Sequence, residues 1–166
     1  MALVISDSST LMHLAWIGQL TLLRDLYAVV MIPPAVWREV VTESKGRPGG
    51  REVIQAQRSG WLIVGRLTDE SHLRMLSREL DDGEAEVLAL AIERAADLVL
   101  LDETEARRIA ELYNIAKTGV IGILIRAKAE GRIGALRPLL DDLRQQGGFW
   151  LADDLYNKAL RVAGEA

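Results

Sequence analysis

The sequence predicts an α/β protein in which a central parallel sheet is flanked by helices in a three-layer arrangement. Two observations lead to this class. Short, continuously apolar segments such as 3–6 and 98–101 are typical of strands buried on both faces of a sheet. Longer segments with apolar residues at helical spacing, above all 84–96, separate them. Strands that alternate with helices in this way form parallel sheets covered on both sides.

The elements follow one another along the chain without a linker or an internal repeat. Ser8 or Ser9 suits the cap of the first helix, and Pro33-Pro34 suits the first turn of the third. We expect strands at 3–6, 29–32, 61–64 and 98–101, with a brief candidate at 115–117. We expect helices at 8–18, 20–26, 35–41, 51–58, 70–79, 84–96, 103–113 and 120–130, and a mostly helical remainder with a Gly147-Gly148 break. The glycine-rich segment 45–50 is the clearest loop.

Length and composition indicate one folded domain spanning 1–166, with the C-terminal helical part, about 133–166, packed on it. The chain is 49% hydrophobic and 27% charged, which excludes a disordered protein. Its apolar runs are too short to cross a bilayer, so we expect no membrane association. The N-terminus lacks the features of a signal peptide, and the absence of cysteine fits a cytoplasmic protein.

The net charge of −4 argues against nucleic acid, but the charge is unevenly distributed. Residues 38–66 carry six bases and three acids, and 105–137 carry seven bases and three acids. Between them, 68–103 carry eleven acids and three bases. An acidic centre between basic flanks suits a metal-dependent enzyme that acts on a polyanion. Ordinary solvated helix faces explain any single one of these charges equally well.

Four acidic residues lie at the ends of predicted strands or within predicted helices that follow them. In a parallel sheet, such positions lie at the same edge. Asp7 and Asp102 each follow an apolar strand, Glu39 lies in the helix after Pro33-Pro34, and Glu84 opens the helix at 84–96. The carboxyl ends of parallel strands form the crevice where ligands bind. Carboxylates gathered there repel one another unless a cation neutralises them, which indicates a hard divalent metal ion.

Each acid also has a simpler interpretation. Asp7 and Asp102 could cap the helices that follow them, Glu39 alone resembles a surface acid, and Asp82 and Glu84 complement a helix dipole. Glu84 shares the apolar stripe of Val87, Leu88, Ala91 and Ala95, whereas Glu86 lies to one side of it. We therefore expect Glu84 to point inward, with a contribution from Glu86 left open.

The order of these motifs resembles that of PIN domains, and more narrowly the short prokaryotic branch related to VapC-type toxins. The resemblance rests on residues 4–11, 32–40, 80–91 and 100–102, supported by 117–124 and 127–133, and it covers nearly the whole chain. It implies a metal-dependent endoribonuclease with Asp7, Glu39, Glu84 and Asp102 as catalytic, metal-binding acids. The third acid is more often aspartate in toxin relatives, so Glu84 is a mild departure.

Further expectations follow from the resemblance. Mg²⁺ or Mn²⁺ would be the cofactor, RNA the substrate, and the products would carry a 5′-phosphate and a 3′-hydroxyl. A small antitoxin partner and the role of a toxin in a toxin–antitoxin pair are implied, whereas a homodimer is expected from the apolar segments 120–125 and 149–151. Ser8 or Ser9 would hold a water or ligand beside Asp7, and Glu105 is a candidate outer acid. The RNA target, the number of metal ions and toxicity stay open.

Three other readings of the sequence remain. One is a degenerate PIN-like module that binds RNA or protein without cutting, although all four acids are present. A phosphatase of similar fold would commonly carry a second aspartate at position 9, which is Ser9 here. The third is an interaction module that uses the apolar segments 120–125 and 149–151.

Basic and aromatic residues are weaker candidates for nucleic-acid contacts. The bases that could steer a phosphate backbone are Arg38, Lys45, Arg47, Arg51, Arg107 and Arg108, although most such charges are simply exposed. The four tryptophans are more typical of cores or interfaces than of base binding. Neither His13, at a core-type position, nor His72, in a polar stretch, suits a histidine-based ribonuclease.

Overall fold

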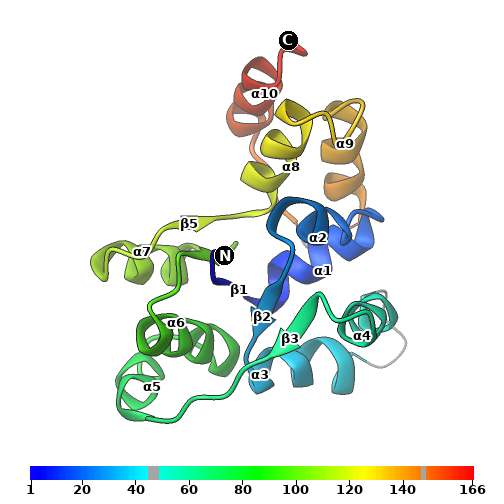
Figure 1. Ribbon diagram of the computed structural model, residues 1–166. Coiled ribbons are helices and arrows are strands. Elements are labelled where there is room, and N and C mark those ends of the chain that lie inside the picture. The colour runs from blue at the N-terminus through cyan, green and yellow to red at the C-terminus, as the bar shows by residue number, and fades with distance from the viewer. Residues whose placement is uncertain (45–48, 147–148) are drawn as a thin grey trace.

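Five parallel strands form the centre of the protein in the computed structural model, which describes residues 1–44, 49–146 and 149–166 (Figure 1). Their order across the sheet is β3-β2-β1-β4-β5, so the first strand lies in the middle. Each pairing is parallel, with Val4 opposite Leu98 and Ile5 opposite Met31. The strands are β1 (Val4–Ser6), β2 (Val30–Ile32), β3 (Leu62–Val64), β4 (Leu98–Leu100) and β5 (Lys117–Thr118).

Helices connect these strands along the described residues. The first part of the chain holds α1 (Ser8–Trp16), α2 (Leu22–Tyr27), α3 (Pro34–Trp37), the π-helix η1 (Arg38–Thr42) and α4 (Gly50–Arg58). The middle part holds α5 (Ser71–Leu76), α6 (Asp82–Arg94) and α7 (Thr104–Leu112). The last part holds α8 (Val120–Ala129), α9 (Arg137–Gln145) and α10 (Asp153–Val162). Among the described helices, none is long and apolar enough to cross a membrane.

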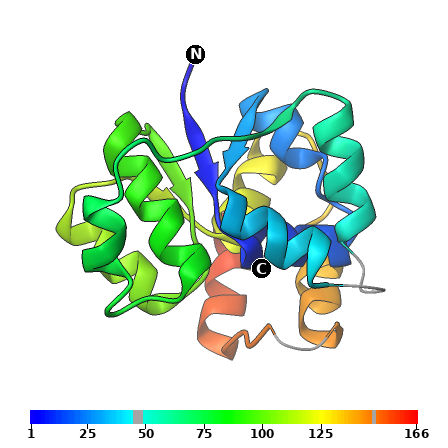
Figure 2. The ribbon, with the colours of Figure 1, turned by 90° about the horizontal axis from the view of Figure 1, so that it is seen from below.

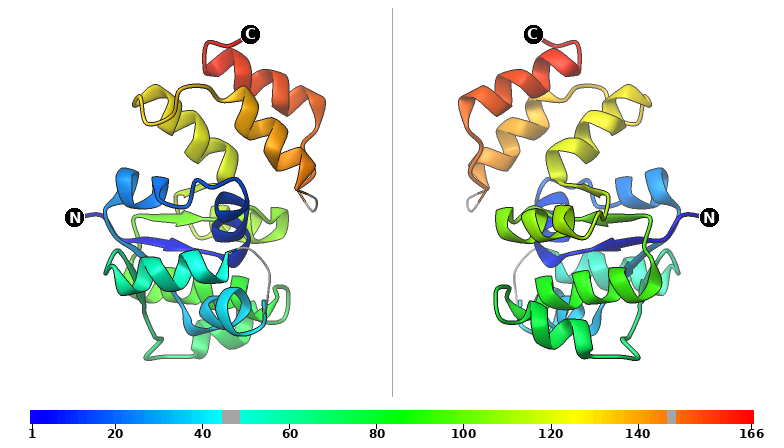
Figure 3. Two further views of the ribbon diagram at one scale, coloured as in Figure 1. Left: turned by 90° about the vertical axis from the view of Figure 1, so that its right-hand side faces the viewer. Right: turned by 90° about the vertical axis from the view of Figure 1, so that its left-hand side faces the viewer.

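The helices form layers on both sides of the sheet. Helices α6 and α7 lie on one side, where α6 contacts β1 and β4, and α1, α2 and α4 lie on the other (Figures 1 and 2). Helices α8, α9 and α10 extend the second side away from the sheet, with α8 in contact with α1 (Figure 3). This is the expected three-layer α/β architecture with an all-parallel sheet.

The apolar strand residues form the middle of the hydrophobic core. Ile5, Ile32 and Leu100 are completely buried, as expected for strands covered on both faces. The same cluster of buried side chains continues into the C-terminal helices through Leu136, Leu140, Leu143, Leu151, Tyr156, Ala159 and Leu160. Strand β3 differs, because Ile63 and Val64 are exposed at the edge of the sheet.

The structure departs from the expected elements in three places. The helix expected at 35–41 is a single α-turn followed by the π-helix η1. The last strand lies at Lys117–Thr118, two residues later than expected, because Asn114 adopts a left-handed conformation (φ 56°) and Ile115 still bonds back to Ala110. The polar helix expected at 70–79 shortens to α5. Of the loop predicted at 45–50, residues 45–48 lie outside the described residues and Gly50 already begins α4, and the glycine break at 147–148 also lies outside the described residues.

Candidate active site

An acidic pocket of about 540 Å³ lies where β1 and β4 end and α6 begins. Six carboxylate side chains line it, from four different parts of the chain, and among the described residues no lysine, arginine or histidine lines it. The pocket is lined by Asp7, Ser8, Ser9, Met12, Glu39, Glu43, Ser44, Asp81, Glu84 and Glu103. The structure therefore brings three of the four predicted acids, Asp7, Glu39 and Glu84, to one pocket.

Asp7 is the most deeply buried of these acids, with 2% of its surface exposed. It is the N-cap of α1: its Oδ1 accepts the backbone N–H of Thr10 at 2.8 Å, and its Oδ2 accepts that of Asp102 at 3.1 Å. Burial, and next the nearby charge of Asp102, raise the pKa of Asp7 from 3.8 to about 7, against the opposing effect of these hydrogen bonds. The capping and the functional interpretations of Asp7 are thus compatible.

Glu39 reaches the pocket from the π-helical turn η1. Single π-turns inside helices frequently occur at functional sites, because the extra residue changes the direction of a side chain. The Ser8 hydroxyl donates to Glu39 Oε2 at 2.6 Å, and the contact expected between Ser8 or Ser9 and a water or ligand stays a prediction. Burial raises the pKa of Glu39, with smaller contributions from the charges of Asp81 and Glu43.

Glu84 lines the pocket from the first turn of α6, whose N-cap is Asp81. Asp81 Oδ1 accepts the Glu84 N–H at 2.9 Å, so the two carboxylates stay close together. Burial raises the pKa of Glu84 to about 7, and the charges of Asp81 and Glu103 add to the shift. Glu86 faces elsewhere, because its Oε1 accepts the backbone N–H of Ala35 at 3.2 Å at the start of α3.

Asp102 is the one predicted acid that does not line the pocket. Its Oδ1 accepts the backbone N–H of Val120, the first residue of α8, at 2.8 Å. Its Oδ2 lies 2.8 Å from Nδ1 of His13. Asp102 therefore caps a helix, as one interpretation of the sequence suggested. The helix that it caps is α8, and not α7, which follows it in the sequence. Gly119 permits this contact, because a Cβ there would press against Asp102 Oδ1.

Asp81 and Glu103 line the pocket although the sequence did not single them out. Glu103 follows Asp102 directly and is exposed, and Ser9 Oγ donates to its Oε1 at 3.3 Å. The sequence does contain a signal for Asp81, which stands three residues before Glu84, at the spacing of an N-cap. Glu103 is the other acid after the same strand, and only the backbone geometry shows which of the two points to the pocket.

The remaining charged candidates lie around the pocket without lining it. Glu105 pairs with Arg108, which also reaches Glu79, and all three side chains are exposed. Arg107 donates to the Leu101 carbonyl at 2.8 Å and so supports the backbone at the end of β4. Arg38 is exposed and lines a smaller pocket of about 250 Å³ that shares Glu39, Glu43 and Asp81 with the acidic one. Lys45 and Arg47 lie outside the described residues.

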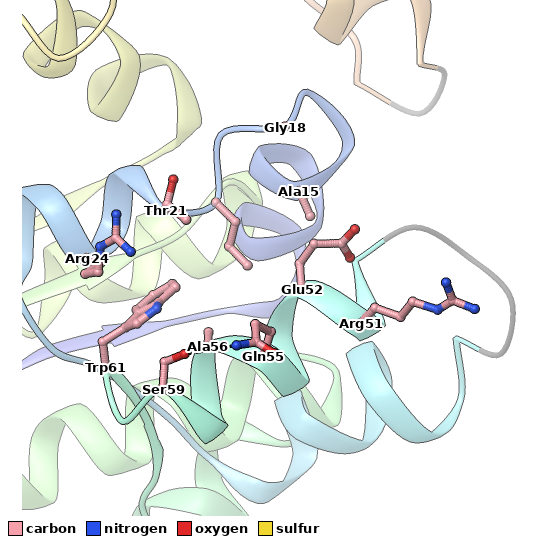
Figure 4. Close-up of a pocket in the computed structure, with 11 residues that line it drawn as sticks. Ala15, Gly18, Thr21, Arg24, Arg51, Glu52, Gln55, Ala56, Ser59 and Trp61 are labelled. Atoms are coloured by element: carbon pink, nitrogen blue, oxygen red, sulfur yellow. Dashed lines mark hydrogen bonds between the residues drawn. The ribbon is translucent and has the colours of Figure 1, made fainter.

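A second pocket, of about 570 Å³, lies further along α1 (Figure 4). Helix α1 contributes to both pockets, through Met12 in the acidic one and Ala15 in this one. Trp61 and Ala56 give it a mainly apolar lining, with Arg24, Arg51 and Glu52 toward its rim. None of the four predicted acids lines this pocket. Trp61 is thus part of a pocket lining, whereas another tryptophan, Trp150, is 86% exposed.

The donor set of the acidic pocket suits a hard divalent cation, because it consists of carboxylate and hydroxyl oxygens. Burial, and next the charges of neighbouring acids, raise the pKa values of Asp7, Glu39 and Glu84, and a bound cation would oppose these shifts. Within the described residues, however, no three acidic or histidine side chains converge on one point as metal ligands do. Mutual repulsion of uncompensated carboxylates favours such separation.

Fold and pocket together define a class: a three-layer α/β protein with an acidic pocket at the carboxyl ends of its parallel strands. A family model described as a PIN domain matches residues 3–165, so the chain belongs to this PIN-domain family. PIN domains are generally nucleases and typically use divalent metal ions. No curated protein matches the chain.

Proposed function

We propose that the protein is a Mg²⁺- or Mn²⁺-dependent endoribonuclease that uses the acidic pocket. The observation that carries the proposal is the convergence of Asp7, Glu39 and Glu84 on one pocket whose described lining residues include no base. Burial, and next the charges of neighbouring acids, raise the pKa values of Asp7, Glu39 and Glu84, and perturbed pKa values of this kind are typical of functional sites. Membership of the PIN-domain family supports the reaction class.

The residues of the chain would divide the work as follows. Asp7, Glu39 and Glu84 would hold the cation, with Ser8 orienting Glu39 and Asp81 placed beside Glu84. Bound there, the metal ion would activate a water and stabilise charge on the attacked phosphate. Asp102 would act next to Asp7, through its backbone N–H and its charge. Products with a 5′-phosphate and a 3′-hydroxyl are expected.

The acids alone would repel RNA. In this proposal, basic residues from the flanking parts of the sequence therefore bind the RNA backbone. Arg38 is exposed beside the acidic pocket and is the described base nearest to Glu39 in the chain. A guanidinium at this position would contact a backbone phosphate adjacent to the one being cleaved. We therefore expect Arg38→Ala to weaken RNA binding without changing metal affinity.

The test combines metal binding with RNA cleavage in matched variants. Asp7→Asn and Glu84→Gln should each lower Mn²⁺ affinity in calorimetry and lower cleavage of single-stranded RNA, by on the order of a hundredfold, or about 2.7 kcal/mol. Asp154→Asn and Glu105→Gln serve as controls, because both acids are exposed and outside the pocket. End-group analysis should find 5′-phosphates.

The opposite result would be equally clear. If the folded wild-type protein bound no Mn²⁺ or Mg²⁺ with RNA present, the nuclease proposal would be wrong. A degenerate PIN-like module that binds RNA or protein without catalysis would then be the better account. The orientation of Asp102 toward His13 and Val120 is the observation that favours this second candidate.

The biological setting is a further part of the proposal. We infer a place in the VapC-like branch, as a cytoplasmic toxin that forms a homodimer and has a small antitoxin partner. The arrest of bacterial growth on induced expression, relieved in Asp7→Asn, would support this role. Normal growth at high levels of folded protein would contradict it, and light scattering would give the oligomeric state.

A further inference from the structure

His13 connects Asp102 to a distant part of the chain. Its ring is buried in α1, with 8% of the residue exposed, and its Nδ1 lies 2.8 Å from Asp102 Oδ2. Because an ionised carboxylate only accepts hydrogen bonds, Nδ1–H is the donor in this contact. The other oxygen of Asp102 accepts the Val120 N–H. Both carboxylate oxygens are therefore held, one by a side chain and one by the backbone of α8.

Two aromatic rings fix the orientation of the imidazole. Trp16, one helical turn further along α1, meets it edge to face with ring centroids 5.5 Å apart and an interplanar angle of 70°. Phe149 meets it at 4.7 Å and 83°. Such edge-to-face pairs contribute beyond simple burial. Phe149 belongs to the segment between α9 and α10, so the C-terminal helical part of the chain reaches the surroundings of Asp102.

We propose that His13 is a positioning residue for the Asp102 carboxylate, and that Phe149 makes this support depend on the C-terminal segment. Partners that orient an acidic group next to a metal site typically change metal affinity by about 10–100-fold when they are removed. His13 would act in this way through Asp102, without touching substrate or metal. The influence on metal affinity rests on the proposed function; the positioning of Asp102 does not.

The alternative is that the pair is simply a buried ion pair that stabilises the core. The two roles differ in what they require of residue 13. A structural role needs bulk and burial, whereas a positioning role needs a donor at the place of Nδ1. Asparagine presents its amide nitrogen near that place, glutamine presents it near Nε2, and leucine has no donor. His13→Asn, His13→Gln and His13→Leu therefore separate the two.

The first measurement needs no metal. The Val120 amide reports the position of Asp102, because it donates to Oδ1 of that carboxylate. In NMR spectra at constant pH, we expect the Val120 amide signal to shift and its hydrogen exchange to accelerate in His13→Leu and His13→Gln. His13→Asn should keep both close to wild type. An unchanged Val120 amide in folded His13→Leu or His13→Gln would overturn the proposal.

The second measurement is Mn²⁺ affinity by electron paramagnetic resonance. We expect His13→Leu and His13→Gln to weaken it about tenfold, and His13→Asn to restore most of the loss. Phe149→Ala should weaken it less and in the same direction. Trp150→Ala is the matched control, because Trp150 is adjacent in the chain and 86% exposed. Equal behaviour of Phe149→Ala and Trp150→Ala would overturn the role of the C-terminal segment.

The two measurements also distinguish this proposal from the proposed function. If the wild-type protein bound no Mn²⁺, the nuclease proposal would fail, and the Val120 amide would still decide whether His13 positions Asp102. If Mn²⁺ bound tightly and with the same affinity in all His13 variants, the nuclease proposal would stand. The proposed influence of His13 on metal affinity would then be overturned, and the Val120 amide would decide separately whether His13 positions Asp102.

Discussion

The side chain of Asp7 makes two structural contacts at once. As the N-cap of α1 it completes the hydrogen bonding of the helix start, and it also receives the N–H of Asp102 from the neighbouring strand end. Its position in the middle of the sheet removes it from water and brings it close to a second acid. The protein thus keeps a carboxylate where its ionisation is unfavourable, which is typical of functional sites. A cation bound beside Asp7 would make the ionised form more favourable.

This leads to a prediction on pH and stability. The pKa of Asp7 is about 7 in the folded protein and 3.8 is its ordinary value, so between these values the folded state holds a proton that the unfolded state has lost. Without metal, the free energy of unfolding should therefore fall as the pH rises from 5.5 to 8, by about 2 kcal/mol. Denaturant unfolding in EDTA measures it.

The control is Asp7→Asn, which should remove the part of this dependence that comes from Asp7. The raised pKa values of Glu84 and Glu39 leave a remaining dependence of the same sign. Acids whose pKa is lowered, such as Glu93 and Glu165, remain ionised throughout this range and do not contribute. Mg²⁺ should stabilise the wild-type protein more at pH 8 than at pH 5.5, because it competes with protons. A free energy of unfolding that rises with pH in EDTA would contradict the prediction.

At the level of single residues, the sequence identified positions better than orientations. Asp7, Glu39 and Glu84 could be selected because strand ends and helix starts converge in a parallel sheet. Asp102 was selected for the same reason, but its carboxylate is held by Val120 and His13, and Glu103 faces the pocket instead. The direction of a side chain after a strand depends on local backbone angles, which neighbouring residue types do not reveal.

At the level of elements, the site depends on how η1 and α6 pack. Gly83, in the first turn of α6, is buried beside the Glu39 carboxylate. A Cβ at this position would overlap both Glu39 Oε1 and its carboxyl carbon. The observed position of the Glu39 carboxylate therefore requires glycine here, although glycine is unfavourable inside a helix.

Gly83→Ala should accordingly damage the site more than the fold. Alanine favours the helix by about 1 kcal/mol, but the Glu39 side chain would have to move away from its contact with Ser8. We expect about a tenfold weaker Mn²⁺ affinity, with a free energy of unfolding within about 1 kcal/mol of wild type. Gly134→Ala is the control, since a Cβ there meets nothing within 4 Å. Equal metal affinities of the two variants would exclude the effect.

The strands and most helices could be predicted, whereas the π-helix could not. Four of the five strands lie within one residue of their expected bounds, because continuous apolar runs have a direct cause in two-sided burial. The turn at Arg38–Thr42 has the composition of an ordinary α-helix, and its extra residue is accommodated only by packing against α4 and α1. Such tertiary causes leave no periodic pattern in the sequence.

At the level of the whole molecule, the C-terminal helices share the hydrophobic core with the sheet. Leu140 and Leu143 of α9 are completely buried, and Glu165 accepts the backbone N–H groups of Leu136 and Arg137 near the start of that helix. We therefore propose that residues 133–166 form one cooperative domain with the remainder, as the sequence suggested.

Leu140→Ala tests this. Removing a fully buried leucine costs about 2–5 kcal/mol, and in a single domain the cost applies to the whole molecule. The unfolding midpoint should fall equally whether it is followed by tryptophan fluorescence or by far-UV circular dichroism. Leu155→Ala, at a residue 45% exposed on α10, should have little effect. Two separate transitions would show that the C-terminal helices unfold independently.

The strand order has a consequence for the stage of synthesis at which the acidic pocket can be assembled. The first strand stays without its neighbour β4 until residue 98 has been made, and the Asp102 contacts also need Val120 and His13. Asp7 and Glu103 thus come to line one pocket only after most of the chain has been synthesised. Under the proposed function, a nascent chain would be harmless to the message that encodes it, and cleavage would begin only with a nearly finished polypeptide.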